Sequence, residues 1–222
     1  MADDRRSIEP NLEVQYTYPT DMRGATQLLT ERHFVLQDRR PNHLGDVDLI
    51  AMDPSLRNLL FTDGTVTRTL EVHTLARVFV EVVSQSRAPA PADVVSNLKI
   101  QAGMESVQRR VIIGTDASTI PVIWAESHIV PSRLPSGFLG ILDGAPDGIG
   151  ESLQQVKLES SRELLWFGLD SPPEWSGLLE EVEPTVLKRL YRVITKGRPA
   201  LLISESFAVE RQSGAYHLNW LR

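Results

Sequence analysis

The chain has 222 residues, of which 41% are hydrophobic and 23% are charged, and its formal net charge is −6. This composition is that of one globular domain with a sizeable core, and the acidic balance argues against a nucleic acid partner. The absence of cysteine excludes disulfides, thiolate nucleophiles and cysteine-based metal sites. No apolar run approaches the roughly 18 residues of a membrane span, and the N-terminus lacks the layout of a signal peptide. A cytoplasmic protein without a membrane partner is therefore expected.

The first part of the chain differs from the rest. Residues 1–40 are mixed in character, and prolines and a glycine interrupt any regular pattern. We expect an N-terminal extension here, either partly disordered or laid across the body, and one domain at residues 41–222. Regular structure is predicted to begin at Asp53, which suits the N-cap of a helix with Pro54 as its first residue.

The middle of the chain is predicted to consist mainly of strands. Residues 66–83 carry β-branched side chains densely enough for one or two strands, and residues 84–94 are interpreted as a loop rich in proline and alanine. Further strands are predicted at residues 107–113, 121–131 and 164–169, and a helix at residues 151–158.

The stretch from residue 187 to residue 207 is predicted to be a β-hairpin. Two apolar runs flank a turn in which Gly197 supplies a permissive backbone. Together, these elements predict a single α+β domain in which helices flank an antiparallel sheet.

The second strand of this hairpin carries a carboxylate among apolar residues. Because alternate side chains of a strand share a face, Glu205 points the same way as Leu201, Ile203 and Phe207. A carboxylate there either finds a partner or has its pKa raised by desolvation, and both states are useful in a small-molecule site. In the alternative interpretation, the strand ends near Ser204 and Glu205 is solvated.

Arg109 is a second charged residue on an apolar strand face, which it shares with Val107, Val111 and Ile113. A guanidinium in such a place is a bidentate receptor for a carboxylate, because its planar donors match two carboxylate oxygens. Two structural alternatives are open: Arg109 extends into solvent at the strand edge, or it pairs with Glu205 for structure alone.

Two further features are weaker signals. Glu126 and His128 share a strand face, which is compatible with proton transfer but is more typical of a surface or hydrogen-bonded histidine. The five histidines are scattered without ligand spacing, so no metal site is expected. The glycine-rich turn at residues 148–150 lacks the remaining features of a phosphate loop, but its backbone N–H groups suit a ligand carboxylate.

The sequence resembles the chorismate pyruvate-lyase family (chorismate lyase, 4-hydroxybenzoate synthase) over roughly residues 53–208. The order and spacing of the matching segments are more specific than any one of them. These segments are DPSLRNLLFTDGTVTRTLE (53–71), QRRVII (108–113), ESHIVPSRLP (126–135), GIGESL (148–153) and RLYRVITKGRPALLISESF (189–207).

The resemblance implies an antiparallel sheet that encloses a small buried ligand cavity. It also implies an enzyme that converts chorismate to 4-hydroxybenzoate and pyruvate without a cofactor, with Arg109 and Glu205 as catalytic residues. The substrate-binding residues that it implies are Val66, Val111, Ile149 and Gly150. A small-molecule substrate is the expected partner, and the oligomeric state, monomer or dimer, is left open.

The chain also departs from the family pattern. Val66 stands where some members have a pocket-lining Met, and Gly150-Glu151 stands where other members have Gly-Arg. Two alternatives therefore accompany the lyase interpretation. One is a specialised-metabolism enzyme that uses the same pocket for another elimination, dehydration or cyclisation, and the other is a non-catalytic module that binds a small ligand.

Overall fold

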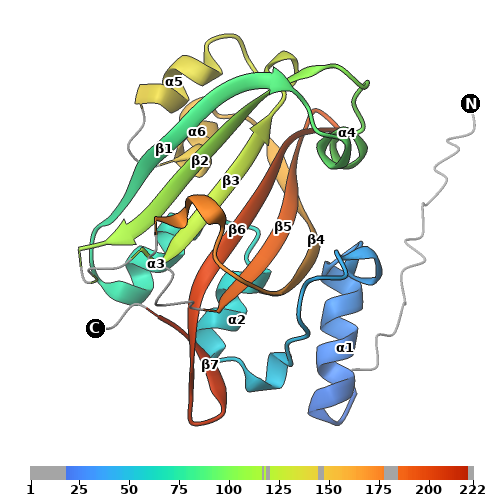
Figure 1. Ribbon diagram of the computed structural model, residues 1–222, viewed down its shortest axis with the longest axis vertical. Coiled ribbons are helices and arrows are strands. Elements are labelled where there is room, and N and C mark those ends of the chain that lie inside the picture. Colours follow the sequence, from blue (N-terminus) through green and yellow to red (C-terminus); the bar gives the residue numbers. More distant parts are fainter. Residues whose placement is uncertain (1–18, 117, 119–120, 145–147, 178–184, 220–222) are drawn as a thin grey trace, which may run out of the picture.

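The main element of the protein is an antiparallel β-sheet (Figure 1). The computed structural model describes residues 19–116, 118, 121–144, 148–177 and 185–219. Within these residues, strands run in the order β1-β2-β3-β6-β5-β4, and β7 pairs with β6 outside this path. The strands are β1 (Val78–Pro89), β2 (Glu105–Thr115), β3 (Ile123–Ile129), β4 (Ser160–Asp170), β5 (Val186–Thr195), β6 (Arg198–Gln212) and β7 (Ala215–Leu218). The predicted α+β class with an antiparallel sheet is confirmed.

Short helices cover both faces of the sheet. The α-helices are α1 (Met22–His33), α2 (Pro54–Phe61), α3 (Val66–Thr74), α4 (Ala92–Leu98), α5 (Phe138–Gly144) and α6 (Ile149–Gln155); the 3-10 helices are η1 (Gln37–Arg39), η2 (Leu49–Ala51), η3 (Pro131–Arg133) and η4 (Glu174–Ser176). Apolar side chains of α2, α3, α5 and α6 join those of the strands in the main core. Helix α4 packs on the other face through a smaller cluster that includes Leu98 and Leu202. No helix in the described ranges is long and apolar enough to span a membrane.

Two local predictions are confirmed. The carboxylate of Asp53 accepts hydrogen bonds from the N–H groups of Ser55 (2.8 Å) and Leu56 (3.3 Å) and so caps α2, which begins at Pro54. Strands β5 and β6 form the predicted hairpin around Lys196 and Gly197. Both turn residues have positive φ (48° and 71°), the geometry that matches the twist of the flanking strands.

The alternation predicted for β6 is also confirmed. Leu201, Ile203 and Phe207 lie in the main core, whereas Leu202 belongs to the cluster on the opposite face. Strand β6 continues to Gln212, well past Ser204. Because the strand does not end at Ser204, Glu205 stays on the inward face.

The prediction of strands throughout residues 66–83 is wrong for the first half of that segment. Residues Val66–Thr74 form helix α3, and β1 begins only at Val78. Val66 and Leu70, one helical turn apart, are both buried in the main core. The packing of this helical face overrides the strand preference of the β-branched side chains.

The predicted loop at residues 84–94 is also wrong. Strand β1 continues to Pro89, and α4 begins at Ala92. Strand β1 lies at the edge of the sheet and, among the described strands, pairs only with β2. An edge strand tolerates proline and a mostly exposed, polar sequence, which is why residues 84–89 look like a loop.

The described part of the N-terminal region contacts the sheet. Helix α1 is followed by Phe34, which is buried in the main core. The N–H groups of Val35 and Leu36 donate to the carbonyls of Leu164 and Leu165 in β4 (3.1 and 2.9 Å). Residues 1–18 lie outside the described residues, and the domain boundary near residue 40 stays a prediction.

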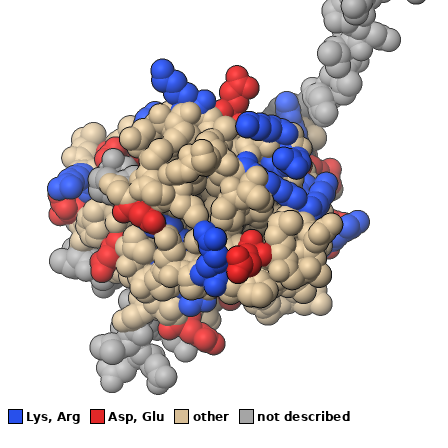
Figure 2. Space-filling model, turned by 90° about the horizontal axis from the view of Figure 1, so that it is seen from above, with Lys and Arg blue, Asp and Glu red and all other residues tan. Residues whose placement is uncertain are grey.

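The surface and the interior differ in how they carry charge. Seen from above, Lys, Arg, Asp and Glu are scattered over a mainly uncharged surface, and several Lys and Arg side chains gather on one side (Figure 2). Arg109, Arg189 and Glu205, in contrast, are buried. Because burying a charge is unfavourable unless it is paired, these residues indicate a specialised site on the inner face of the sheet.

Candidate active site

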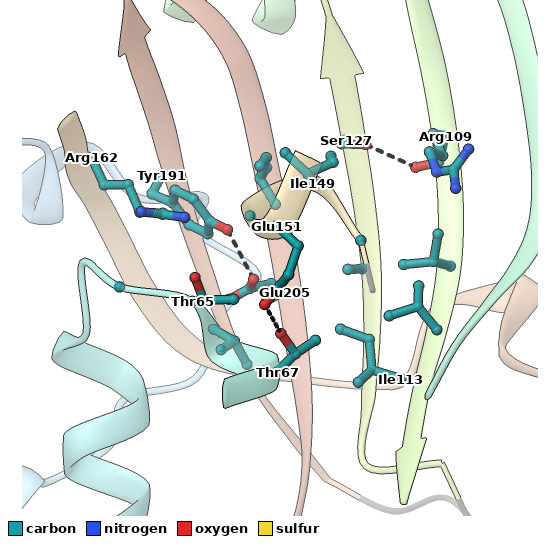
Figure 3. Close-up of a pocket in the computed structure, with 18 residues that line it drawn as sticks. Thr65, Thr67, Arg109, Ile113, Ser127, Ile149, Glu151, Arg162, Tyr191 and Glu205 are labelled. Atoms are coloured by element: carbon teal, nitrogen blue, oxygen red, sulfur yellow. Dashed lines mark hydrogen bonds between the residues drawn. The ribbon is translucent and has the colours of Figure 1, made fainter. Parts of the chain in front are cut away.

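A pocket lies between the inner face of the sheet and the N-terminal ends of α3 and α6 (Figure 3). It contains about 620 Å³ of unfilled space, counting the open solvent at its mouth. The six site residues predicted from the sequence all line it: Val66, Arg109, Val111, Ile149, Gly150 and Glu205. The structure thus brings these residues together, while their roles stay predictions.

The register of the strands explains why Arg109 and Glu205 share this pocket. Glu205 of β6 lies opposite Ala125 of β3, which lies opposite Val111 of β2. Arg109 is two residues from Val111 and therefore faces the same side of the sheet. Two strand spacings place Arg109 and Glu205 roughly 10 Å apart across the sheet, with a further offset along it. The structure shows no direct ion pair between them, and each has other partners.

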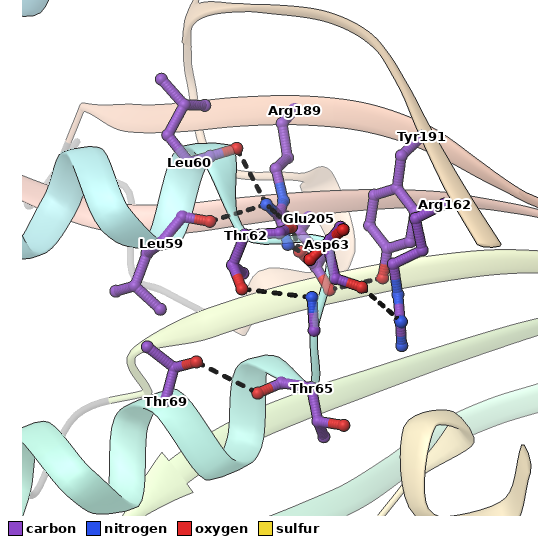
Figure 4. Close-up of polar contacts among 11 residues, drawn as sticks. Leu59, Leu60, Thr62, Asp63, Thr65, Thr69, Arg162, Arg189, Tyr191 and Glu205 are labelled. Carbon is purple, nitrogen blue, oxygen red and sulfur yellow. Dashed lines mark hydrogen bonds and ion pairs between the residues drawn. The ribbon is translucent and has the colours of Figure 1, made fainter. Parts of the chain in front are cut away.

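The partner of Glu205 is Arg189, its neighbour in β5 (Figure 4). Arg189 Nε donates to Glu205 Oε2 at 2.8 Å. Arg189 Nη2 lies 2.7 Å from the same oxygen, but its N–H is not aligned for a second hydrogen bond. The ion pair places a full positive charge beside the buried carboxylate.

Arg189 also connects Glu205 to the end of helix α2. Its Nη1 donates to the carbonyls of Leu59 (2.6 Å), Leu60 (2.9 Å) and Thr62 (3.0 Å). The last carbonyls of a helix have no partner within the helix, and a cation there is also favoured by the helix dipole. One buried side chain therefore satisfies the end of α2 and fixes the position of the carboxylate.

Tyr191 completes the surroundings of Glu205. Its hydroxyl donates to Glu205 Oε1 at 2.9 Å. Burial, together with the neighbouring carboxylate, raises the pKa of Tyr191 well above its ordinary value. The hydroxyl therefore remains a hydrogen-bond donor at neutral pH, and both oxygens of Glu205 are held in fixed directions.

Arg109 is held less firmly at the other side of the pocket. Its Nη1 donates to Gln85 Oε1 of β1 at 2.6 Å and to Asp143 Oδ1 at a longer 3.4 Å, and its Nη2 donates to the Leu142 carbonyl at 3.4 Å. Burial lowers the pKa of Arg109, and the charge of half-exposed Asp143 opposes this effect. Since two of these contacts are long, donors of the guanidinium remain for a ligand carboxylate.

The helix ends close the pocket. Val66 is the first residue of α3, and Ile149 and Gly150 begin α6. A Cβ added to Gly150 would lie 2.9 Å from Thr65 Cγ2, so glycine permits the close approach of α6 to the start of α3. Glu151 also lines the pocket and accepts a hydrogen bond from Thr67 Oγ1 at 3.1 Å.

The sequence interpretation missed several polar residues of the site. Arg189, Tyr191, Arg162 and Gln85 were not predicted. The signal for Arg189 was present, because it shares a strand face with Leu187, Tyr191 and Val193, just as Glu205 does with its apolar neighbours. The role of Gln85 depends on the extension of β1 through a segment that had been interpreted as a loop.

Glu126 and His128 lie on the opposite face of the sheet and do not line the pocket. Glu126 accepts from Arg110 Nε at 2.6 Å, and its Oε1 lies 3.4 Å from His128 Nε2. The hydrogen bond with His128, followed by the contacts with Arg110, lowers the pKa of Glu126 from 4.5 to about 2, although burial opposes the change. This is a hydrogen-bonded structural network. Nowhere in the described ranges do three or more His, Asp or Glu side chains gather as a potential metal site.

A pocket on one face of an antiparallel sheet, with a buried guanidinium at one side and a buried carboxylate at the other, is the geometry of a small-ligand site. The chain belongs to the Rv2949c-like chorismate pyruvate-lyase family, whose sequence profile matches residues 60–213. This finding confirms the family resemblance drawn from the sequence.

Two curated relatives support this assignment, and one solved structure shares the fold. The chain is 27% identical to the chorismate pyruvate-lyase of Mycobacterium tuberculosis over 168 residues, which cover 74% of this chain and 84% of the relative. It is 28% identical to the chorismate pyruvate-lyase of Mycobacterium leprae over 160 residues, covering 70% of this chain and 75% of the other. Among solved structures, PhnF from Mycobacterium smegmatis shares the fold with a TM-score of 0.55 at 11% identity, covering 68% of this chain and 67% of PhnF.

Proposed function

We propose that the protein is a chorismate pyruvate-lyase, which converts chorismate to 4-hydroxybenzoate and pyruvate. The observation that carries this proposal is the placement of Arg109 and Glu205 on one sheet face in one pocket. The family assignment and the named relatives support it. The atoms of the two products add up to those of chorismate, so the reaction needs no water, oxidant or cofactor.

Arg109 binds the ring carboxylate of the substrate in this scheme. Chorismate carries that carboxylate, a ring hydroxyl and an enolpyruvyl ether on a cyclohexadiene ring. The planar guanidinium offers parallel donors to both carboxylate oxygens, and Gln85 holds it from the side of β1. Substrate binding and turnover are then expected to depend together on Arg109.

Glu205 contacts the ring hydroxyl and controls the proton that must leave. The ether C–O bond breaks while the ring carbon that carries the hydroxyl loses its hydrogen, and the electron pair of that C–H bond completes the aromatic ring. The proton passes either to Glu205 or directly to the enolpyruvyl methylene group, which becomes the methyl group of pyruvate. Arg189 and Tyr191 fix the carboxylate in both schemes, so that the reacting groups are already oriented.

The first test is to incubate the purified protein with chorismate and to measure 4-hydroxybenzoate and pyruvate by chromatography. Equal amounts of both products are expected. Arg109→Ala should lose substrate binding and turnover, and Glu205→Gln should lower kcat by about 100-fold or more with a smaller effect on KM.

Arg110→Ala is the matched control, because Arg110 neighbours Arg109 but points to the opposite face of the sheet. It should retain activity. If chorismate or 4-hydroxybenzoate raises the melting temperature without product formation, the protein is a binding module and the proposed activity is wrong. Full activity in Glu205→Gln would remove Glu205 from the mechanism.

A further inference from the structure

The pocket contains a second guanidinium, that of Arg162, which the scheme above does not use. Arg162 projects from β4 and lines the pocket on the side away from Arg109 (Figure 3). Its Nη1 donates to the carbonyl of Asp63 at 2.6 Å (Figure 4). Its Nε is buried and has no hydrogen-bond partner among the residues that the structure describes. Buried donors of a charged group are rarely left unpaired, so Arg162 has hydrogen-bonding capacity beyond its contact with Asp63.

The sheet places the two arginines at opposite ends of one cavity. Arg162 lies opposite Val193 of β5, on the inward side, and Arg109 lies on β2. Strands β5, β6 and β3 separate them, so that roughly 19 Å lie between the two backbones. Both long side chains reach into the same space, with Tyr191 and Glu205 between them.

The charge of the lining favours a ligand with two negative groups. Glu205 is offset by Arg189 behind it. The other charged residues of the lining are Arg109, Arg162 and Glu151. Half-exposed Asp143, outside the lining, lies 3.4 Å from Arg109 Nη1. The two guanidinium groups of the lining lie at opposite ends of the pocket instead of side by side. A molecule with an acid group at each end and a polar, uncharged middle matches this arrangement.

We propose that Arg162 binds the second acid group of the ligand and makes the site selective for dicarboxylates. For the identity of the substrate, this inference rests on the proposed function. Chorismate offers its ring carboxylate to Arg109 and its enolpyruvyl carboxylate to Arg162, whereas 4-hydroxybenzoate has only the ring carboxylate. Arg162 therefore strengthens the binding of the substrate but not that of the aromatic product.

Kinetics of Arg162→Gln test this role directly. The variant should raise KM for chorismate about tenfold or more, the effect of losing one charge-assisted hydrogen bond, and should leave the inhibition constant of 4-hydroxybenzoate unchanged. Arg162→Lys keeps the charge, so its KM for chorismate should lie between those of the native protein and of Arg162→Gln. The control is Arg87→Gln, an exposed residue of β1 outside the pocket. Equal changes for substrate and product, or no change for either, would overturn the proposal.

A binding experiment separates this inference from the proposed lyase activity. Calorimetry compares 3-(carboxymethoxy)benzoate, which has a ring carboxylate and an ether-linked carboxylate, with 3-methoxybenzoate, which has only the first. The native protein should bind the diacid about tenfold more tightly, and Arg162→Lys should reduce the difference. A native protein that prefers the diacid but does not convert chorismate would refute the lyase and keep the role of Arg162. Equal affinity for the two probes would refute the role of Arg162 whatever the activity.

Discussion

Two Arg–Glu pairs lie on opposite faces of the same sheet and differ in their surroundings. The inward pair, Arg189–Glu205, has side chains that are 0% and 6% exposed, and the outward pair, Arg110–Glu126, has side chains that are 33% and 28% exposed. The inward pair is almost wholly shielded from solvent and is held by Tyr191 and by the carbonyls at the end of α2. The outward pair retains water and interacts with His128.

This difference teaches what an ion pair does in each place. Coulomb attraction in an exposed pair is screened, so such a pair contributes little to stability. A buried pair must first overcome the desolvation of both charges, and apolar residues often serve stability equally well. The presence of the buried Arg189–Glu205 pair, whose carboxylate lines the pocket, therefore points to a use of the carboxylate beyond stability. The Arg110–Glu126 pair needs no such explanation.

The largest effect is expected from removing one member of the inward pair. Arg189→Met should lower the free energy of unfolding by about 3–5 kcal/mol, because it leaves the charge of Glu205 buried without its cationic partner. Urea denaturation measures this change. Adding Glu205→Gln to the same chain should restore part of the loss. If the double variant is no more stable than Arg189→Met, the cost comes from the carbonyls of α2 and not from the orphaned carboxylate.

A smaller effect is expected at the second donor to Glu205. Tyr191→Phe keeps the ring but removes the hydrogen bond to Oε1, and should lower the free energy of unfolding by about 1.5–3 kcal/mol. Because Arg189 still holds the other oxygen, the variant should bind substrate with nearly native KM and show a reduced kcat. An unchanged kcat together with reduced stability would show that Tyr191 supports the fold only.

The smallest effect is expected at the outward pair, and it should depend on pH. The folded-state pKa of Glu126, about 2, lies below the ordinary 4.5, so the folded state binds fewer protons than the unfolded state between these values. The stabilisation is therefore present above about pH 4.5 and is lost as the pH falls towards 2. Glu126→Gln should reduce the free energy of unfolding by about 1 kcal/mol or less at neutral pH.

Denaturation of native and Glu126→Gln protein at several pH values measures this gap. The gap should close between pH 4.5 and 2. A gap that stays constant would mean that the network with Arg110 and His128 acts through packing and not through charge.

The sequence predicted correctly those elements that depend on neighbouring residues, and it failed for an element that depends on contacts with distant parts of the chain. Turn and capping signals involve neighbours in the chain, so Asp53 at the start of α2 and Gly197 in the hairpin were predicted correctly. Residues 66–74 depended on distant contacts. Their β-branched composition favours a strand, but burial of Val66 and Leu70 against the sheet makes them a helix.

The sequence by itself determined the family and the inward position of Glu205. The family follows from the order of five segments, and the position of Glu205 follows from the two-residue period of a strand. Only the tertiary structure decided that Glu205 pairs with Arg189 instead of Arg109, and that Arg162 lines the same cavity. The physical reason is that alternation fixes the face of a side chain within its own strand, whereas its partners depend on the order and register of strands far apart in the chain.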